Sequence, residues 1–242
     1  MLNYPSLLAL LMVGLTGAGA AQPAPATIVV FGDSTTAESP PVRAYGQLVE
    51  QALTERLGRP VRVINAGVRG NTTAMAAARF EREVLAVRPD LLVIQFGIND
   101  ATIDVWQKPP ATRPRVALAN YVANLRNFAS AARAHGARVI LMTPNPLGWT
   151  PQLKELYGHP PYEVSDPDSL NLNLTQYAAA MRALAVERKL PLVDVRRAHE
   201  TWMGGAAEPL VADGMHPSQR GHELVAQLLA DAIVAQRLLP AR

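Results

Sequence analysis

The sequence predicts an α/β fold in which helices cover both faces of a five-stranded parallel sheet, a three-layer α/β/α sandwich. Five short apolar runs alternate along the chain with longer amphipathic stretches. Strands separated by helices pair in parallel, because right-handed crossovers place each helix on a face of the sheet. Nearly half of the 242 residues are hydrophobic, which is enough to bury one sizeable core. We therefore expect one folded domain, spanning residues 27–242.

The predicted elements follow one another in strict alternation. The expected strands are Thr27–Phe31, Val61–Asn65, Leu91–Phe96, Arg138–Met142 and Leu192–Val195. The expected helices are Tyr45–Leu57, Thr72–Val87, Val116–His135, Leu174–Lys189 and Pro217–Leu238. Gly58 and Gly136 fit the position just after a helix, and Pro217 fits a first helical turn, where its missing N–H costs nothing.

Two proline-rich stretches, Thr102–Arg115 and Pro144–Asp168, follow strands and are predicted to be irregular. They are longer than ordinary connections, and such loops tend to shape binding sites. Trp106 and Trp149 lie in them and are candidates for stacking on a sugar or for closing over a substrate. The alternative is that these side chains only pack the loops onto the sheet.

Residues 1–20 are predicted to be a signal peptide, followed by a short extended linker over residues 21–26. An apolar run from Leu7 to Leu15 precedes Ala18-Gly19-Ala20, a small-x-small pattern typical of signal peptidase sites. The run is shorter than the roughly 20 residues that a spanning helix needs, which disfavours a membrane anchor. We expect export to the periplasm or the extracellular space. The chain has no cysteine, so no disulfide can stabilise it there.

The charge of the chain gives no reason to expect a nucleic-acid partner. The formal net charge is only +3, and the basic residues are scattered singly along the sequence. The sequence does not indicate an oligomeric state.

Four polar clusters follow predicted strands or precede the last helix. They are Gly32-Asp33-Ser34, "NAGVRGNTT" (65–73), "FGIND" (96–100) and "DGMHP" (213–217). The carboxyl ends of parallel strands meet at one edge of a sheet, so we expect all four clusters to gather there.

A hydroxyl, an imidazole and a carboxylate within these clusters could form a nucleophilic site. Serine is a poor nucleophile unless a nearby base takes its proton, and His216 is the natural base for Ser34. Asp213, three residues before His216, can reach the other ring nitrogen and stabilise the imidazolium that forms during attack. The pattern therefore predicts catalysis by Ser34, His216 and Asp213.

Attack on an ester carbonyl creates an oxyanion, which needs hydrogen-bond donors fixed in advance. Three are available: the backbone N–H of Ser34, the backbone N–H of Gly70 and the side-chain amide of Asn99. Arg69 and Asn71 lie beside Gly70 and are candidates for lining the substrate pocket.

The remaining titratable residues are interpreted as structural. Asp213, His216 and His222 could in principle bind a metal, but no other ligand cluster supports this, so we expect no metal and no cofactor. His135 is expected at a helix C-terminus and His199 on a surface turn. Asp33 and Asp100 are expected to orient loops rather than transfer protons.

These blocks together resemble the SGNH hydrolase superfamily, also called the GDSL esterase and lipase family, from about Thr27 to the last helix. "FGDST" matches the nucleophile block, "NAGVRGNTT" the block whose glycine N–H joins the oxyanion hole, "GIND" the Gly-x-Asn-Asp block and "DGMHP" the Asp-x-x-His block. The resemblance favours Gly70 over Gly67 as the oxyanion glycine. It implies a flavodoxin-like sandwich with an open, flexible site for small acyl esters. Thr35 replaces the leucine of the family's shorthand name, which is more like the carbohydrate-acetylesterase branches.

We therefore expect an exported serine esterase that hydrolyses short-chain carboxylic esters through an acyl-enzyme and deacetylates carbohydrates. A lysophospholipase or thioesterase of the same family is the first alternative. A non-catalytic envelope protein that binds glycans is the alternative from another class.

Overall fold

The computed structural model describes residues 24–203 and 209–241 of the chain. Five parallel strands form one sheet in the order β2-β1-β3-β4-β5. Their bounds are β1 Ala26–Gly32, β2 Val61–Gly67, β3 Leu91–Gln95, β4 Arg138–Met142 and β5 Leu192–Val193. The predicted α/β fold with a five-stranded parallel sheet is therefore confirmed. In this order β2 lies on one side of β1, and β3, β4 and β5 follow on the other side. The point between β1 and β3 where the order of strands switches sides is where open α/β sheets bind their ligands.

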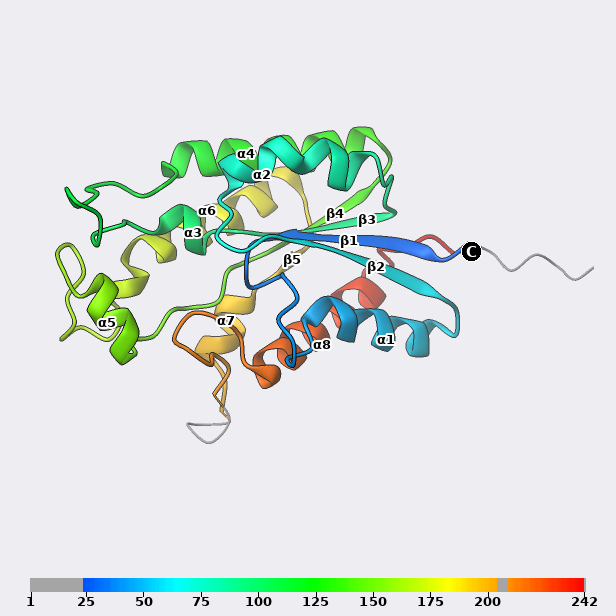
Figure 1. The fold of residues 1–242 in the computed structure, drawn as a ribbon. Coiled ribbons are helices and arrows are strands. Elements are labelled where there is room, and N and C mark those ends of the chain that lie inside the picture. Colours follow the sequence, from blue (N-terminus) through cyan, green and yellow to red (C-terminus); the bar gives the residue numbers. More distant parts are fainter. Residues whose placement is uncertain (1–23, 204–208, 242) are drawn as a thin grey trace, which may run out of the picture.

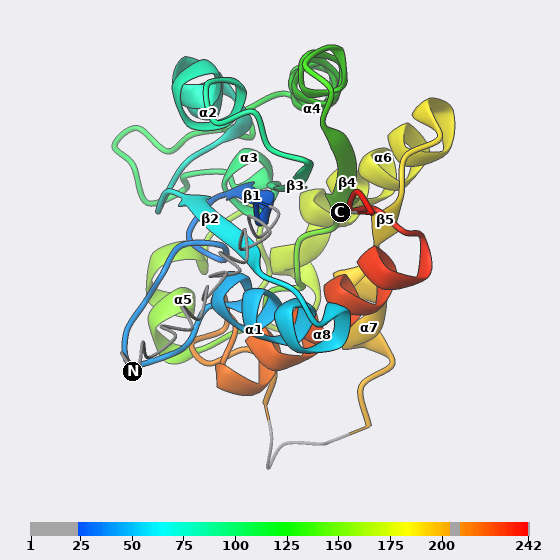
Figure 2. The ribbon, with the colours of Figure 1, turned by 90° about the vertical axis from the view of Figure 1, so that its right-hand side faces the viewer.

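Helices cover both faces of the sheet, as the views in Figure 1 and Figure 2 show. The helices are α1 Tyr45–Leu57, α2 Thr73–Phe80, α3 Ile98–Ala101, α4 Leu118–Ala134, α5 Pro151–Tyr157, α6 Leu172–Arg188, α7 Val195–Glu200 and α8 Gln219–Ala235. Helices α2, α4 and α6 pack on one face, and α1 and α8 pack on the other. The carboxyl ends of the strands point toward α3 and α5, at the left in Figure 1.

Alternation along the strands divides the core between the two faces. Val29 and Phe31 pack under α2, α4 and α6, whereas Ile28 and Val30 pack under α1 and α8. The first of these cores is aromatic: the ring of Phe31 meets three other phenylalanine rings edge-on, with centroids 5.3–5.5 Å apart. The buried end of β1 is thus anchored directly below the segment that carries Ser34.

The outer edge of β2 is covered by side chains. The backbone N–H of Val63 donates to Glu50 Oε2 of α1 at 2.6 Å, and that of Val61 donates to Thr54 Oγ1 at 3.3 Å. The N–H of Gly67 donates to Asn65 Oδ1 at 2.9 Å. These bonds satisfy donors that no neighbouring strand reaches.

Several predicted boundaries were wrong, and local hydrogen bonding explains each. Pro217 is not in the first turn of α8, because the Ser218 hydroxyl accepts from the N–H of Gly221 and makes Ser218 the cap. The stretch 144–168 is not wholly irregular, since Thr150 caps α5. The predicted last strand ends early because Asp194 caps α7. The helix expected over 72–87 is interrupted by a π-helical turn, Glu81–Leu85.

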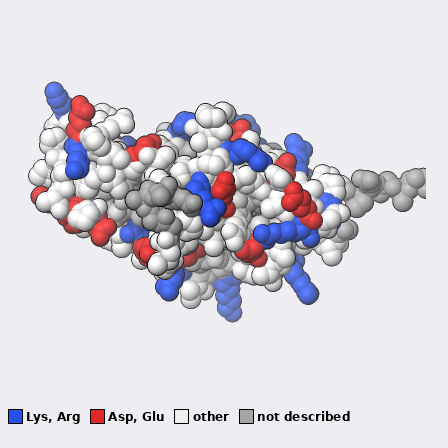
Figure 3. Space-filling model, turned by 90° about the horizontal axis from the view of Figure 1, so that it is seen from below, with Lys and Arg blue, Asp and Glu red and all other residues white. Residues whose placement is uncertain are grey.

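The predicted signal peptide, residues 1–20, lies outside the described residues. Within the described ranges, no helix has the length and apolar character needed to span a bilayer. Figure 3 shows Lys and Arg side chains interspersed with Asp and Glu on the face seen from below. This mixed surface agrees with the scattered charges of the sequence.

Candidate active site

Ser34 lies in the tight turn that follows β1. The backbone N–H groups of Thr36 and Ala37 donate to the carbonyl of Asp33 at 3.2 and 3.0 Å, and the Asp33 carboxylate accepts from the N–H of Thr35 at 2.9 Å. A Cβ atom at Gly32 would lie 2.1 Å from Thr36 Oγ1, so only glycine fits before the turn. The glycine and the acid that flank the strand end therefore shape the turn that presents the Ser34 hydroxyl.

The imidazole of His216 lies between Ser34 and Asp213. Its Nε2 is 3.0 Å from Ser34 Oγ, and its Nδ1 is 2.8 Å from Asp213 Oδ2. A carboxylate only accepts hydrogen bonds, so the Nδ1 proton faces Asp213 and the neutral ring presents Nε2 as an acceptor to the serine hydroxyl. The geometry matches a nucleophile, a base and an orienting carboxylate.

The Asp213 carboxylate is held in its ionised form. Partial burial raises its pKa, but hydrogen bonds from the backbone and ring of His216 and from the N–H of Met215 outweigh this, so the pKa lies below its ordinary value. The side chains of Asp213 and His216 are nevertheless 51% and 35% exposed. This side of the site is open to solvent.

The segment that carries this pair is a compact loop. The N–H of Ala212 donates to the carbonyl of His216 at 2.8 Å, and Gly214, with φ +83°, accepts from the N–H of Gly148 at 2.9 Å. A Cβ at Gly214 would lie 2.2 Å from the Gly148 carbonyl oxygen. The close approach of these two glycines joins the loop to the segment after β4.

Asn99 lies in α3, directly after β3, and is only 8% exposed. Its Oδ1 accepts a hydrogen bond from Arg115 Nη1 at 2.9 Å. The neighbouring Asp100 accepts from the N–H and the hydroxyl of Thr73 at 2.9 and 2.5 Å, which ties α3 to the start of α2. Burial raises the pKa of Asp100 to about 6. Gly70, with φ +73°, lies in the exposed turn between β2 and α2.

A buried arginine that the sequence analysis missed joins the ends of β1 and β2. Arg79 donates to the carbonyl of Gly32 at 2.9 Å, to the carbonyl of Ala66 at 2.8 Å and to Asn71 Oδ1 at 2.8 Å. Its guanidinium also lies over the ring of Phe31. Asn71 is therefore part of this buried cluster and not of the groove beside Ser34, in contrast to its predicted place in the pocket lining.

A groove of about 270 Å³ opens beside Ser34 and His216. Arg69 lines this groove and donates from Nη2 to Ser39 Oγ at 2.7 Å. The other lining residues are Ser39, Val42, Ala212, Asp213, Pro217 and His222.

The two tryptophan candidates lie elsewhere, on the long loops. Trp106 is 50% exposed. Trp149 donates from Nε1 to the carbonyl of Asp166 at 2.9 Å and packs against the small core that contains Tyr157 and Tyr162. Packing of the loops thus explains Trp149, whereas half of the Trp106 side chain is exposed to solvent.

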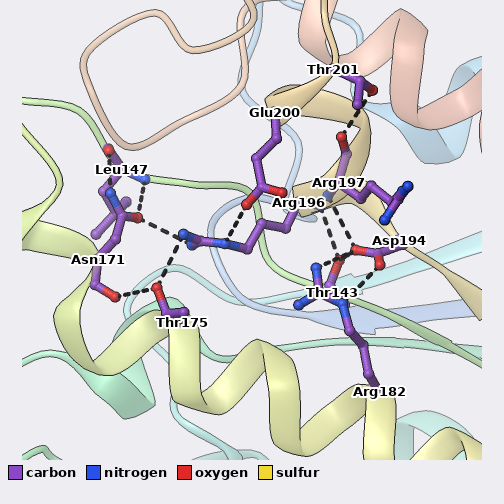
Figure 4. Close-up of polar contacts among 10 residues, drawn as sticks. All are labelled: Thr143, Leu147, Asn171, Thr175, Arg182, Asp194, Arg196, Arg197, Glu200 and Thr201. Atoms are coloured by element: carbon purple, nitrogen blue, oxygen red, sulfur yellow. Dashed lines mark hydrogen bonds and ion pairs between the residues drawn. The ribbon is translucent and has the colours of Figure 1, made fainter.

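A second polar cluster fixes the segment after β4 (Figure 4). Arg196 of α7 donates to Asn171 Oδ1 at 3.3 Å and to Glu200 Oε1 at 3.0 Å. Asn171 in turn bonds both the N–H and the carbonyl of Leu147, each at 2.8 Å. The sequence analysis missed this cluster as well, because its members lie on separate elements.

The other histidines differ from expectation at one position. His222 is buried, its Nδ1 accepts from the N–H of Tyr45 at 3.2 Å, and burial lowers its pKa to about 4. His199 does not lie on a surface turn: it lies in α7, and burial lowers its pKa to about 4. His135 caps the C-terminus of α4, as predicted. Across residues 24–203 and 209–241, no group of three or more His, Asp or Glu side chains could hold a metal ion.

Comparisons with known proteins point to one family. The model of the GDSL-like lipase/acylhydrolase family matches residues 30–224. The chain is 30% identical over 188 residues to an acetylxylan esterase from Geobacillus stearothermophilus, covering 76% of each protein. It is 26% identical to a rhamnogalacturonan acetylesterase from Bacillus subtilis, covering 86% of this chain and 90% of that protein. The crystal structure of the lipase/acylhydrolase from Enterococcus faecalis superposes with a TM-score of 0.68 at 29% identity, over 90% of this chain and 98% of the other.

Proposed function

The chain belongs to the GDSL-like lipase/acylhydrolase family and is a carboxylic ester hydrolase, and we propose that it is an exported serine esterase that removes short acyl groups, acetyl first, from carbohydrates. The observation that carries the mechanism is the continuous contact from Ser34 Oγ through His216 to Asp213, with distances of 3.0 and 2.8 Å. The family assignment agrees with the resemblance found in the sequence.

In the first half-reaction, Ser34 Oγ attacks the carbonyl carbon of the ester while its proton passes to His216 Nε2. Asp213 stabilises the imidazolium. The carbonyl oxygen becomes an oxyanion that accepts hydrogen bonds from the N–H of Ser34, the N–H of Gly70 and the side-chain amide of Asn99. When the tetrahedral intermediate collapses, the bond to the alcohol oxygen breaks and His216 gives its proton to that oxygen.

In the second half-reaction, water attacks the acyl-enzyme. His216 takes a proton from the water, and the same donors hold the second oxyanion. The bond to Ser34 Oγ breaks, the proton returns to this oxygen, and the carboxylic acid leaves. The cycle needs no cofactor, because every proton is moved by His216.

A carbohydrate ester is the substrate class that we propose. The groove beside Ser34 is open and has a polar margin formed by Arg69 and Ser39, which suits a hydroxylated ligand. Trp106, exposed on the loop after α3, is available to stack on a sugar ring. Two of the relatives described above are acetylesterases named for polysaccharides.

Export is proposed from the sequence of residues 1–20. Expression of the full chain with a C-terminal tag is expected to yield an extracytoplasmic product that begins near residue 21. N-terminal sequencing of the fractionated protein checks this, and a cytoplasmic product that keeps Met1 would contradict it.

A panel of p-nitrophenyl esters of increasing chain length, together with acetylated xylo-oligosaccharides, tests the activity. We expect the wild type to prefer acetyl esters and Ser34→Ala to lose turnover by a factor of about 10⁴ or more. Ser165→Ala, which alters an exposed serine on the loop before α6, is the control and should keep full activity.

Each contrary outcome has its own meaning. Full turnover by Ser34→Ala would rule out the nucleophile. Turnover that rises with acyl length would favour a lysophospholipase or thioesterase over a carbohydrate acetylesterase. Binding of the oligosaccharides without turnover of any ester would favour a glycan-binding protein.

A further inference from the structure

The side chain of Asn99 is held from behind by an ion pair. Arg115 Nη1 donates to Asn99 Oδ1 at 2.9 Å. Two other nitrogens of the same guanidinium, Nε and Nη2, reach the two carboxylate oxygens of Asp104 at 2.9 and 2.7 Å. Such a bidentate pair fixes the plane of the guanidinium as well as its position.

The ion pair is itself built into the loop that follows α3. The backbone N–H of Arg115 donates to the carbonyl of Thr102 at 3.0 Å, and the N–H of Ala111 donates to the carbonyl of Asp104 at 3.2 Å. The side chains of Arg115 and Asp104 are only 28% and 11% exposed. Burial lowers the pKa of Arg115, but the hydrogen bonds and charge of Asp104 outweigh this and raise it above its ordinary value.

The contact with Arg115 decides which way the amide of Asn99 faces. A guanidinium has only donors, so the amide must present its oxygen to Arg115, and Nδ2 must face the other way. The opposite amide orientation would set two N–H donors against each other. Burial raises the pKa of the Asp33 carboxyl, and hydrogen bonds from Thr35 and from the Asn99 side chain partly offset this rise. Nδ2, the donor end of the amide, is therefore directed away from Arg115, on the side of the amide that interacts with the Asp33 carboxyl.

We propose that Arg115, fixed by Asp104, is a positioning residue that keeps Nδ2 of Asn99 directed at the oxyanion. This inference rests on the proposed function, in which Asn99 is an oxyanion donor. A donor must stand in place before the charge develops, because reorientation during the reaction would cost part of the stabilisation. The positive charge of the Arg115 guanidinium beside Oδ1 also polarises the amide and strengthens the hydrogen bond that Nδ2 donates.

A double-mutant cycle on kcat tests the proposal. Arg115→Met keeps the aliphatic stem and removes the donors, and we expect kcat to fall about tenfold with little change in KM, a part of the loss that removal of a whole oxyanion donor causes. In the Asn99→Ala background, Arg115→Met should change kcat by less than about twofold, because the group through which it acts is gone. Arg115→Lys, which keeps the positive charge on a single donor nitrogen, should lie between Arg115→Met and the wild type.

The control is Arg126→Met, which breaks an exposed ion pair with Glu187 and should leave kcat unchanged. Thermal unfolding of each variant reports whether it folds. If Arg115→Met does not fold, Asp104→Asn takes its place in the same cycle, since it loosens the guanidinium without removing it.

The outcomes separate this inference from the proposed function. An equal fall in kcat on Arg115→Met in the wild-type and Asn99→Ala backgrounds would overturn the positioning role, as would no fall at all in the wild type. An Asn99→Ala variant with undiminished kcat would instead overturn the oxyanion role of Asn99 itself.

Discussion

The two sides of Ser34 are built in different ways. On the proton-relay side, Asp213 and His216 lie three residues apart in one loop, and their side chains are 51% and 35% exposed. On the side of the proposed oxyanion donors, Asn99 is 8% exposed and Asp100 is fully buried, and their partners Arg115 and Thr73 come from other segments. The first side is local and exposed to solvent. The second, around Asn99, is buried and assembled from distant parts of the chain, whereas Gly70 lies in an exposed turn.

This difference suits what each side has to do. The relay must pass protons between Ser34, the leaving alcohol and water, so His216 needs access to the groove. The oxyanion donors gain from rigidity and from a low local dielectric, because they must stabilise charge without moving. The contrast predicts that mutations on the relay side affect chemistry alone, whereas mutations on the oxyanion side affect chemistry and stability together.

The largest effect is expected at His216. His216→Asn removes the base and should lower kcat by about 10⁴ to 10⁶, the residual rate coming from the oxyanion donors and binding. The free energy of unfolding should change by less than about 1 kcal/mol, because the side chain is partly exposed. Hydrolysis of p-nitrophenyl acetate and urea unfolding measure the two quantities. His135→Asn, at the exposed end of α4, is the control, and a large loss of stability in His216→Asn alone would break the contrast.

The next effect is expected at Asn99. Asn99→Ala should lower kcat by about 10² to 10³ through loss of one oxyanion donor. It should also lower the free energy of unfolding by about 1–3 kcal/mol, since Arg115 Nη1 loses its acceptor in a partly buried site. The same two assays apply. A variant that loses activity but unfolds like the wild type would show that the oxyanion side is not built into the stability of the fold.

The last prediction concerns His222, six residues after His216, and is an effect of pH on stability and not on catalysis. The pKa of His222 is lowered from 6.5 to about 4 by burial, so between these pH values the unfolded chain holds a proton that the folded protein does not. The free energy of unfolding should therefore fall as the pH is lowered from 6.5 to 4, with up to about 3 kcal/mol of the fall due to His222.

His222→Asn keeps an acceptor for the N–H of Tyr45 but does not titrate, so its stability should depend less on pH over this range. Denaturant unfolding at pH 7, 5.5 and 4 measures the dependence, with the wild type and His135→Asn as references. Identical pH profiles for His222→Asn and the wild type would show that the buried ring is not the titrating group.

The sequence predicted the sheet and the four polar clusters because both depend on short-range patterns. Alternating apolar runs place the strands, and each cluster follows a strand end, so the parallel sheet brings Ser34 and His216 together although 182 positions separate them. The parts that were missed depend on long-range contacts of residues that are usually exposed. Arginines such as Arg79 and Arg115 are usually exposed, and nothing in the sequence marks these two as buried. Only the fold shows that Arg79 donates to the carbonyl of Gly32, 47 positions away.

The errors at helix ends have a similar cause. Pro217 was assigned to a first helical turn from its own preference, but the neighbouring Ser218 is the better cap and shifts the start of α8. His199 was expected on a surface turn, but it lies in α7. In α7, Arg197 and Glu200 are exposed, whereas Nε2 of His199 is buried.

The hydrogen bonds from side chains along the outer edge of β2 affect the tendency of the protein to aggregate in concentrated solution. A seven-residue edge strand with free N–H groups would be a template to which a strand of another molecule could add, the first step of aggregation. Glu50, Thr54 and Asn65 already occupy such donors, and the opposite edge, β5, is only two residues long. An incoming strand would find these N–H donors of β2 already bonded and only a short partner at β5, so strand addition at both edges of the sheet is disfavoured.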